Sequence, residues 1–254
     1  MDEIRYIPTI EGSGPRQMAV DEAILRCYDK GLSPPTLRFF KFSPSAITMG
    51  YAQDVDGVIH TERCRELGMP YVRRITGGGT VYHDLQGEIT YSIVTDIIPG
   101  AIEDSFHHLL KPIIDTLRDY DLEAEFKPYN DILVNGKKIS GSAQRRGRKG
   151  MLQHGTLMYA TDLSTLASIL KLDMDKLRAR GAKSFFDLVT TMEDELGWKP
   201  EPDDLIGEMK EAYGKHLGVK IVPGALNEHE LQMADELTLK YSHESWTYNR
   251  KWKC

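Results

Sequence analysis

The sequence predicts an α+β protein, in which a mainly antiparallel β-sheet is flanked by helices. Three observations support this fold class. Strand-like segments dominate the first 160 residues. Residues 131–146 hold an Asn-Gly pair between two strand-like runs, which is a strong signal for a hairpin. After about residue 160 the segments become mainly helical. We expect residues 1–254 to form one domain with a helical C-terminal part.

Each predicted element follows from a local pattern. Clusters of β-branched and aromatic residues between turn signals predict strands at residues 5–12, 36–42, 46–52, 70–75, 88–97, 131–146 and 150–160. Apolar residues that recur every three or four positions predict helices at residues 15–31, 60–68, 102–117, 162–172, 202–218 and 225–242. In the first of these helices Cys27 falls on the apolar stripe, so we expect it in the core.

The composition excludes several classes of protein. The formal net charge of −6 argues against a nucleic-acid-binding surface. No apolar run approaches the roughly 18 residues that a membrane span requires. The acidic first segment lacks the apolar stretch of a signal peptide, so we expect a cytoplasmic protein. Cys27, Cys64 and Cys254 are too far apart to form a metal-ligand pair or a disulfide framework.

A glycine-rich segment is the first candidate site. In RRITGGGTVYHD, residues 73–84, two arginines precede three glycines. Glycines let backbone N–H groups approach a ligand closely, and nearby arginines attract a carboxylate or phosphate. A plain tight turn is the alternative interpretation. The segment is neither a Walker A loop nor a dinucleotide-binding fingerprint, because it lacks the Gly-Lys-Ser/Thr sequence and the helix that would follow.

The second candidate site is the predicted hairpin YNDILVNGKKISGSAQRR, residues 129–146. Lys138 lies just past the turn and is followed by small residues, so it can lie along a groove and meet a phosphate or carboxylate. Asp131 on the partner strand can orient this lysine or hold a metal ion. A solvated hairpin tip is the alternative for Lys138, and a structural role is the alternative for His154 on the next strand.

Together these motifs resemble the lipoate–protein ligase A family, within the wider biotin/lipoyl ligase superfamily. The resemblance rests on RRITGGGTVYHD, NDILVNGKKISGSAQRR and LQHGTL, and it extends over MAVDEAIL, LRFFKFSPSAITMGYAQ and KYSHESWTYNR. It implies a biotin/lipoyl protein ligase-like catalytic domain. It also implies an enzyme that activates lipoate or octanoate with ATP and Mg²⁺ to an acyl-adenylate. The acyl group would then pass to a lysine of a lipoyl carrier domain in a dehydrogenase complex, or of the glycine cleavage H protein.

The resemblance also assigns roles to individual residues. Lys138 would be the catalytic lysine that contacts the carboxylate and the α-phosphate oxygens. Asp131 would also lie near the metal. The residues that would line the lipoate and nucleotide pocket are Arg73, Arg74, Gly77, Gly78, Gly79, Thr80, Val81, Tyr82, His83, Asn130, Asp131, Ser142, Ala143 and His154.

Two alternatives to the ligase remain open. Octanoyltransferases of the same superfamily move the acyl group between carriers through a cysteine thioester, and the segment GEITYS, residues 87–92, is closer to their form. One group of them has its cysteine shortly before the stretch that matches YNDILV, where this chain has none. A non-catalytic lipoyl-binding accessory protein is the other alternative, although Lys138, Asp131 and the glycines are all kept.

The length and charge pattern add two hypotheses about partners. Many ligases of this family carry a further C-terminal domain, whereas this sequence stops where their catalytic domain ends. We therefore expect a bipartite ligase with a separate accessory subunit. The basic run RRGRKG, residues 145–150, is either a solvated turn or a docking patch for an acidic carrier domain.

Overall fold

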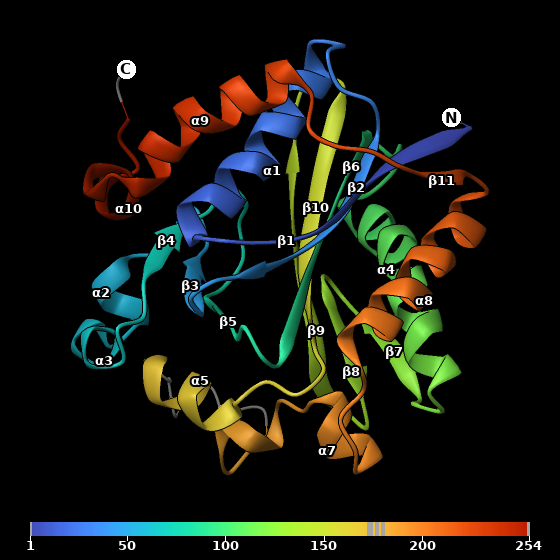
Figure 1. Cartoon of the computed structure of the whole chain (residues 1–254). Coiled ribbons are helices and arrows are strands. Elements are labelled where there is room, and N and C mark those ends of the chain that lie inside the picture. The colour runs from blue at the N-terminus through green and yellow to red at the C-terminus, as the bar shows by residue number, and fades with distance from the viewer. Residues whose placement is uncertain (1, 172–174, 176–177, 179–180, 253–254) are drawn as a thin grey trace.

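In the computed structural model, helices cover both faces of a large central sheet and a second, smaller sheet lies at one side (Figure 1). The structure describes residues 2–171, 175, 178 and 181–252. The strands are β1 (Glu3–Gly12), β2 (Thr36–Phe42), β3 (Ala46–Met49), β4 (Tyr71–Arg73), β5 (Val81–His83), β6 (Glu88–Asp96), β7 (Ala124–Lys127), β8 (Asp131–Val134), β9 (Lys137–Arg146), β10 (Gly150–Met158) and β11 (Lys220–Pro223).

The helices complete the layers. They are α1 (Gly14–Asp29), α2 (Val55–Val58), α3 (Thr61–Glu66), α4 (Ile102–Asp119), α5 (Leu163–Ile169), α7 (Met192–Leu196), α8 (Pro202–Leu217), α9 (Glu228–Ser242) and α10 (Glu244–Asn249), with a 3₁₀ turn at Phe185–Asp187. Helices α1 and α9 pack together on one face of the large sheet, and α4 and α8 pack on the other. Among the described residues, no helix is both long and apolar enough to cross a membrane.

The large sheet has the order β11-β1-β2-β6-β10-β9-β8-β7. Strand β1 runs parallel to both of its neighbours, β2 and β11, whereas the pairs from β2 to β7 are antiparallel. The predicted α+β class with a mainly antiparallel sheet is therefore confirmed. The C-terminal part is mostly helical as expected, but it also returns one strand, β11, to the sheet edge.

The small sheet, β4-β3-β5, revises one expectation from the sequence. The sequence predicts strands at residues 36–42 and 46–52, and the structure places them in different sheets: β2 joins the large sheet and β3, which is shorter than predicted, joins the small one. Strand β3 ends at Met49, and the next residue, Gly50, meets the glycine loop so closely that a Cβ atom there would lie 2.0 Å from the carbonyl oxygen of Gly78. The small sheet thus brings the glycine loop, residues 76–80, against the end of β3.

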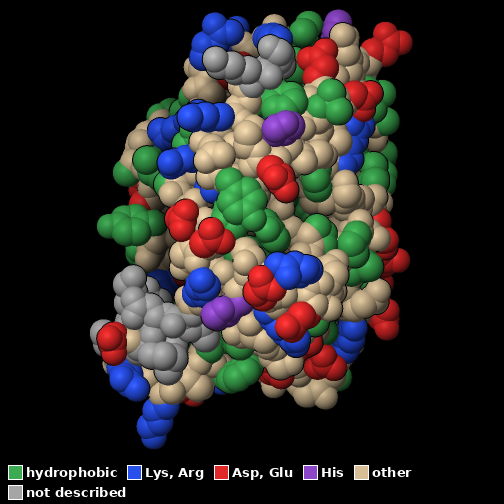
Figure 2. All heavy atoms as spheres, turned by 90° about the vertical axis from the view of Figure 1, so that its left-hand side faces the viewer, with side chains coloured by type: hydrophobic (Ala, Val, Ile, Leu, Met, Phe, Trp, Pro, Cys, Tyr) green, Lys and Arg blue, Asp and Glu red, His purple; other side chains and the backbone are tan. Residues whose placement is uncertain are grey.

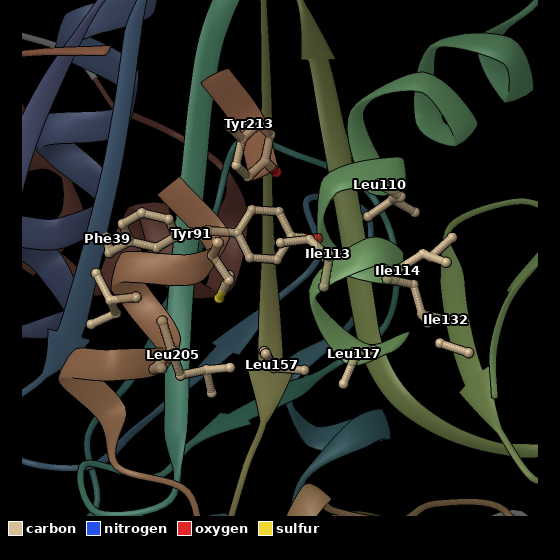
Figure 3. Close-up of a cluster of buried hydrophobic side chains, with 14 of the residues drawn as sticks. Phe39, Tyr91, Leu110, Ile113, Ile114, Leu117, Ile132, Leu157, Leu205 and Tyr213 are labelled. Carbon is tan, nitrogen blue, oxygen red and sulfur yellow. The ribbon is translucent and has the colours of Figure 1, made fainter. Parts of the chain in front are cut away.

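The apolar core on the α4 side anchors the strands that carry the site (Figure 3). Tyr91 and Leu157 of the sheet face Ile113 and Leu117 of α4, all of them buried. The hydroxyl of Tyr91 reaches out of this core and hydrogen bonds to Ser142 Oγ on β9 at 2.7 Å. The core therefore fixes the positions of β6, β9 and β10 relative to one another.

The expected hairpin and the core position of Cys27 are both present. Asn135 and Gly136 have φ values of 51° and 76°, as the two central residues of a type I′ turn require. Cys27 is buried on α1. The predicted helix at 162–172 appears as α5, and its last residue, Leu172, lies outside the described residues. On the face formed by α2, α3 and α10, acidic and basic side chains are interspersed (Figure 2).

Candidate active site

A pocket of about 500 Å³ lies where β9 and β10 meet the glycine loop and the small sheet. Most of its walls come from three segments that are far apart in the sequence, residues 74–83, 130–143 and 154–156, and Met18, Thr48 and Thr90 complete them. The lining residues are Met18, Thr48, Arg74, Gly79, Thr80, Val81, His83, Thr90, Asn130, Lys138, Gly141, Ser142, Ala143, His154, Gly155 and Thr156. Ten of the predicted site residues are thus brought into one cavity.

Lys138 forms one wall of the pocket and is held mainly through its backbone. Its N–H donates to the carbonyl oxygen of Leu188 at 2.8 Å, and its own carbonyl accepts from the N–H of Thr190 at 3.0 Å. The ammonium Nζ lies 2.7 Å from Asp131 Oδ1, and the side chain is 37% exposed. A partly exposed ion pair of this kind is weak, so the ammonium can leave it for a stronger anion.

Two glycines leave the space that the site groups occupy. A Cβ atom at Gly141 would lie 2.5 Å from Lys138 Nζ and 2.6 Å from Cε. A Cβ atom at Gly155 would lie 2.4 Å from the hydroxyl oxygen of Tyr91 and 2.7 Å from Ser142 Oγ. The small residues after Lys138 and His154 are therefore required by close packing at the pocket.

Arg74 places a buried positive charge in the opposite wall. Its Nη2 donates to the carbonyl oxygens of Gly77 and Gly79, at 2.6 and 2.7 Å. Its remaining donors meet oxygen atoms of Thr48 and Thr76 at 3.0–3.2 Å. No ion pair involves Arg74 within the described part of the chain, and burial lowers its pKa to about 10. The pocket therefore has an uncompensated cation, which favours an anionic ligand.

The structure places Arg73 away from this pocket. Its guanidinium donates to the carbonyl oxygens of Gly50, Tyr51, Gln53 and Thr247, at 2.6–3.1 Å. Arg73 is the last residue of β4 and Arg74 follows it, and the different partners of their guanidinium groups show that the two side chains point to different sides. The sequence assigned both arginines to the pocket, whereas Arg73 instead ties α10 to the loop that follows β3.

His154 is held by a carboxylate and contacts the glycine loop. Its Nδ1 lies 2.8 Å from Asp21 Oδ2, and its Nε2 lies 2.7 Å from Thr76 Oγ1. Arg38 donates to the other Asp21 oxygen at 2.9 Å. Burial raises the pKa of Asp21, but the charge of Arg38 and the contact with His154 outweigh it, so the pKa is lowered overall. Burial lowers the pKa of His154, which is therefore neutral near pH 7.

His83 has a similar arrangement on the other side of Arg74. Its Nε2 lies 2.9 Å from Thr48 Oγ1, and its Nδ1 lies 3.2 Å from Glu88 Oε2. Burial and the charge of Arg74 hold the pKa of His83 well below its usual value. Burial also raises the pKa of Glu88 well above its usual value. Both shifts favour the neutral forms of this pair, whereas the lowered pKa of Asp21 favours a charged carboxylate behind His154.

The remaining predicted residues lie in or beside the pocket. Asn130 Nδ2 donates to the carbonyl oxygen of Ser142 at 2.5 Å, which places both at the pocket rim. Asp131 is not part of the lining and reaches the site through Lys138. Tyr82 is also not part of the lining, because its ring packs in the core of the small sheet.

A second hollow of about 980 Å³ adjoins the pocket and shares Asn130, Ser142 and Ala143 with it. Gly77 and Gly78 line this hollow, together with Arg145 and Arg146. The basic turn beyond them is fixed by Asp29, whose carboxylate accepts from the N–H groups of residues 148–150 at 2.8–2.9 Å. Its role in carrier docking stays a prediction.

The thiols of Cys27 and Cys64 are not available at this site. Both side chains are buried, and neither belongs to the lining of the pocket. Burial raises the pKa of both thiols, which opposes formation of a thiolate. Cys254 lies outside the described residues.

The sequence reasoning missed Asp21, Thr76 and Glu88 as parts of the site. Only Asp21 gave a usable signal, because it is a carboxylate within the apolar stretch MAVDEAIL of a helix. A charge at such a position needs a buried partner. Thr76 and Glu88 had no comparable signal.

Comparison with known proteins identifies the family. The chain belongs to the family of the lipoyl protein ligase A/B catalytic domain, whose model matches residues 13–214. It is therefore an enzyme of the lipoyl ligase and transferase family, and the fold and the resemblance deduced from the sequence are confirmed.

Curated relatives and solved structures carry different names within this family. The octanoyltransferase LipM of Clostridioides difficile strain 630 is 31% identical over 99% of this chain and all of the relative. That of Moorella thermoacetica is 32% identical over 92% of this chain and 93% of the relative. The bipartite lipoate protein ligase of Thermoplasma acidophilum is 28% identical with a TM-score of 0.88, covering 100% and 99% of the two chains. A lipoate-protein ligase A bound with ATP is 26% identical with a TM-score of 0.84, covering 97% and 98%.

Proposed function

We propose that the protein joins a lipoyl or octanoyl group to a lysine of a lipoyl carrier domain, after activating the acyl group with ATP. One observation carries this proposal: two cations, the fixed Arg74 and the movable Lys138, face one pocket whose described lining contains no thiol. Such a pocket can bind a carboxylate and a phosphate, but its described lining offers no group for a thioester intermediate.

The reaction needs two steps. In the first, a carboxylate oxygen of the acyl substrate attacks the α-phosphorus of ATP and pyrophosphate leaves, which gives the acyl-adenylate. In the second, the lysine amine of the carrier attacks the acyl carbon, AMP leaves, and the amine loses a proton. Lys138 Nζ would leave Asp131 and stabilise the negative charge that develops in both transition states. Arg74 and the glycine loop would hold the anionic substrate without moving.

Asp131 also fits a role in binding Mg²⁺. Mg²⁺ is usually bound by one or two carboxylates together with substrate phosphates, and Asp131 is a partly exposed carboxylate beside Lys138. Asn130 supplies an amide next to it. Bound there, the ion would neutralise charge on the phosphate oxygens.

Octanoyl transfer from an acyl carrier is the second candidate, and the comparisons favour it over the ATP-dependent ligase. The relatives from C. difficile and M. thermoacetica are both named octanoyltransferases, and the segment GEITYS agrees with them. Against it stands the site itself, because Cys27 and Cys64 are buried away from the pocket. If this reaction occurs, Lys138 would contact the thioester of the donor carrier, and the acyl group would pass to the acceptor without a thioester on the enzyme.

A lipoyl domain is the acceptor that the comparisons support, since the archaeal neighbour was studied together with its E2 lipoyl domain. That neighbour is also bipartite. We therefore propose that an accessory subunit assists activation of the acyl group in this protein too.

Intact-mass analysis of an apo lipoyl domain tests the proposal. One reaction contains the protein, lipoate and Mg-ATP, and a second contains octanoyl-carrier protein with neither lipoate nor ATP. A lipoyl mass gain that requires ATP supports the ligase. A gain only from octanoyl-carrier identifies the transferase. Lipoate binding without a mass gain in either reaction points to the accessory subunit, and no binding and no gain contradict the proposal.

A further inference from the structure

We propose that Thr76 is a positioning residue for binding of the acyl substrate, at the junction of a buried relay from Asp21 through His154 to Arg74. The inference rests on the proposed function, because it names the group that orients the fixed cation of that pocket. Thr76 is fully buried and is not part of the pocket lining, so it acts on a ligand through the lining residues that it contacts, Arg74 and His154.

The charge on Asp21 gives every hydrogen bond of the relay one direction. An ionised carboxylate only accepts, so Nδ1 of His154 carries the proton and donates to Asp21 at 2.8 Å. In neutral imidazole the other nitrogen, Nε2, is then an acceptor. The Thr76 hydroxyl therefore donates to Nε2 at 2.7 Å, and Thr76 Oγ1 is left to accept from Arg74 Nε at 3.0 Å.

The guanidinium of Arg74 links the orientation of the Thr76 hydroxyl to the glycine loop. Its five N–H donors lie in one rigid plane, so the direction of Nε sets the direction of Nη2. Nη2 bonds to the carbonyl oxygens of Gly77 and Gly79, at 2.6 and 2.7 Å. The hydroxyl of Thr76 thereby sets both the position of the cation and the shape of the loop that lies beside the ligand.

The contacts that link His83 through Thr48 to Arg74 cannot replace the hydrogen bond between Arg74 Nε and Thr76. Thr48 Oγ1 accepts from Arg74 Nη1 at 3.2 Å, but the backbone oxygen of Thr48 accepts from the same atom at the same distance. Without the Thr48 hydroxyl, Nη1 would keep an acceptor. Without the Thr76 hydroxyl, Nε would have none among the acceptors that the structure describes, and a buried charged donor without a partner is costly.

Thr76→Val is the test variant, because valine has nearly the shape of threonine but no hydroxyl. Thr76→Ser keeps the hydroxyl and serves as the conservative rescue. Thr116→Val is the control for loss of a buried threonine hydroxyl: Thr116 is fully buried in α4, and among the described residues its Oγ1 bonds only to the carbonyl oxygen of Pro112 in the same helix. Asp21→Asn is less suitable, because it would leave Arg38 as a buried charge without its carboxylate.

The first measurement is the KM for the acyl substrate that the wild-type protein uses, whether lipoate or octanoyl-carrier. We expect Thr76→Val to raise this KM about tenfold with a smaller change in kcat. We expect Thr76→Ser to stay within about twofold of wild type. Thr116→Val should lower the melting temperature and leave the KM unchanged. Equal KM values for Thr76→Val and wild type, or equal shifts for Thr76→Val and Thr116→Val, would overturn the proposal.

The second measurement is amide hydrogen exchange, which does not depend on the proposed function. We expect Thr76→Val to increase exchange in residues 76–81, and Thr116→Val to increase it in α4 instead. If the wild-type protein transfers no acyl group, the proposed function fails, but exchange still tests the relay. Exchange in residues 76–81 that is the same in Thr76→Val and wild type would refute the relay.

Discussion

The two walls of the pocket hold positive charge in opposite ways. Arg74 is buried, and its hydrogen bonds to the loop and to two threonines fix its position. Lys138 is 37% exposed, and within the described residues its ammonium has a single ion pair, with Asp131. The first charge has lost its hydration before any ligand arrives, whereas the second keeps much of its own.

This difference separates binding from chemistry. A fixed, desolvated cation attracts an anion without needing to reorganise, so it suits the ground-state carboxylate or phosphate. A flexible lysine can follow charge that develops on different atoms in successive steps. We therefore expect substitutions that remove or displace Lys138 to reduce kcat, and substitutions that displace Arg74 to raise KM.

The largest effect is expected from Lys138→Ala. Because this variant removes the cation that would stabilise the transition states, kcat for acyl transfer should fall about a hundredfold or more. The melting temperature should change little, since the ion pair with Asp131 is partly exposed. Lys137→Ala is the matched control, because Lys137 is the adjacent lysine on β9 but not part of the pocket lining. Similar losses in both variants would contradict the assignment.

A smaller loss of kcat is expected from Gly141→Ala. The added methyl group would lie 2.5 Å from Lys138 Nζ, so the side chain must move. We expect kcat to fall about tenfold while KM stays nearly constant. Gly207→Ala is the control, because a Cβ atom at this helical position meets nothing within 4 Å. Unchanged kcat in Gly141→Ala would show that the position of Lys138 is not critical.

Glu88→Gln tests the neutral pair beside Arg74 through the pH dependence of stability. The pKa of Glu88 is raised in the folded protein, so the folded state binds a proton that the unfolded state has lost above about pH 4.5. Wild-type stability should therefore fall as the pH rises from that value towards the raised pKa of folded Glu88, by at most about 1.4 kcal/mol per pH unit from this group. Glutamine does not titrate, so the Glu88→Gln variant lacks this loss of stability.

The measurement is denaturant unfolding of both proteins between pH 4.5 and 8. We expect the free energy of unfolding of Glu88→Gln, relative to wild type, to increase with pH. His83 and His154 contribute in the opposite direction below about pH 6.5, because burial lowers their pKa values, but both proteins share this contribution. A difference that does not vary with pH would show that Glu88 is ionised in the folded state.

The smallest effect is expected from removing the thiols. A variant with Cys27→Ala, Cys64→Ala and Cys254→Ala should keep wild-type kcat, because the proposed reaction uses no thioester on the enzyme. It should be somewhat less stable, since two of the thiols are buried. Loss of transfer in a variant that still unfolds cooperatively would identify a cysteine nucleophile and favour the octanoyltransferase.

Local signals in the sequence predicted most of the large sheet and the helices on its faces. The Asn135-Gly136 turn and the apolar stripe of α1 are such signals, because neighbouring residues determine them. The separation of β2 and β3 into two sheets was not predicted, because it depends on which distant strands each of them pairs with: β2 pairs with β1 and β6, and β3 pairs with β4 and β5. The pairing of β11 with β1 is also a long-range contact that no local pattern contains.

The residues of the candidate site also fall into two groups: those that local sequence signals predicted, and those that depend on long-range contacts. Lys138, Arg74 and His154 could be located because glycines or other small residues follow each of them within three positions. The contrast between Arg73 and Arg74 could not be predicted, because it depends on which carbonyl oxygens lie on each side of β4. Nor could the partners of the two histidines, since Asp21 is 133 residues away from His154 in the sequence.

The parallel pairing of β1 with β11 also bears on synthesis of the chain. Translation makes β1 before β11, so one of the two hydrogen-bonding neighbours of β1 is complete only when residue 223 has left the ribosome. Helix α1 packs against α9, so its packing is also incomplete until α9 has been synthesised. Until then β1 presents an open strand edge that another chain can pair with. Chaperone binding during translation should therefore concentrate on the N-terminal segment and end once α9 has emerged.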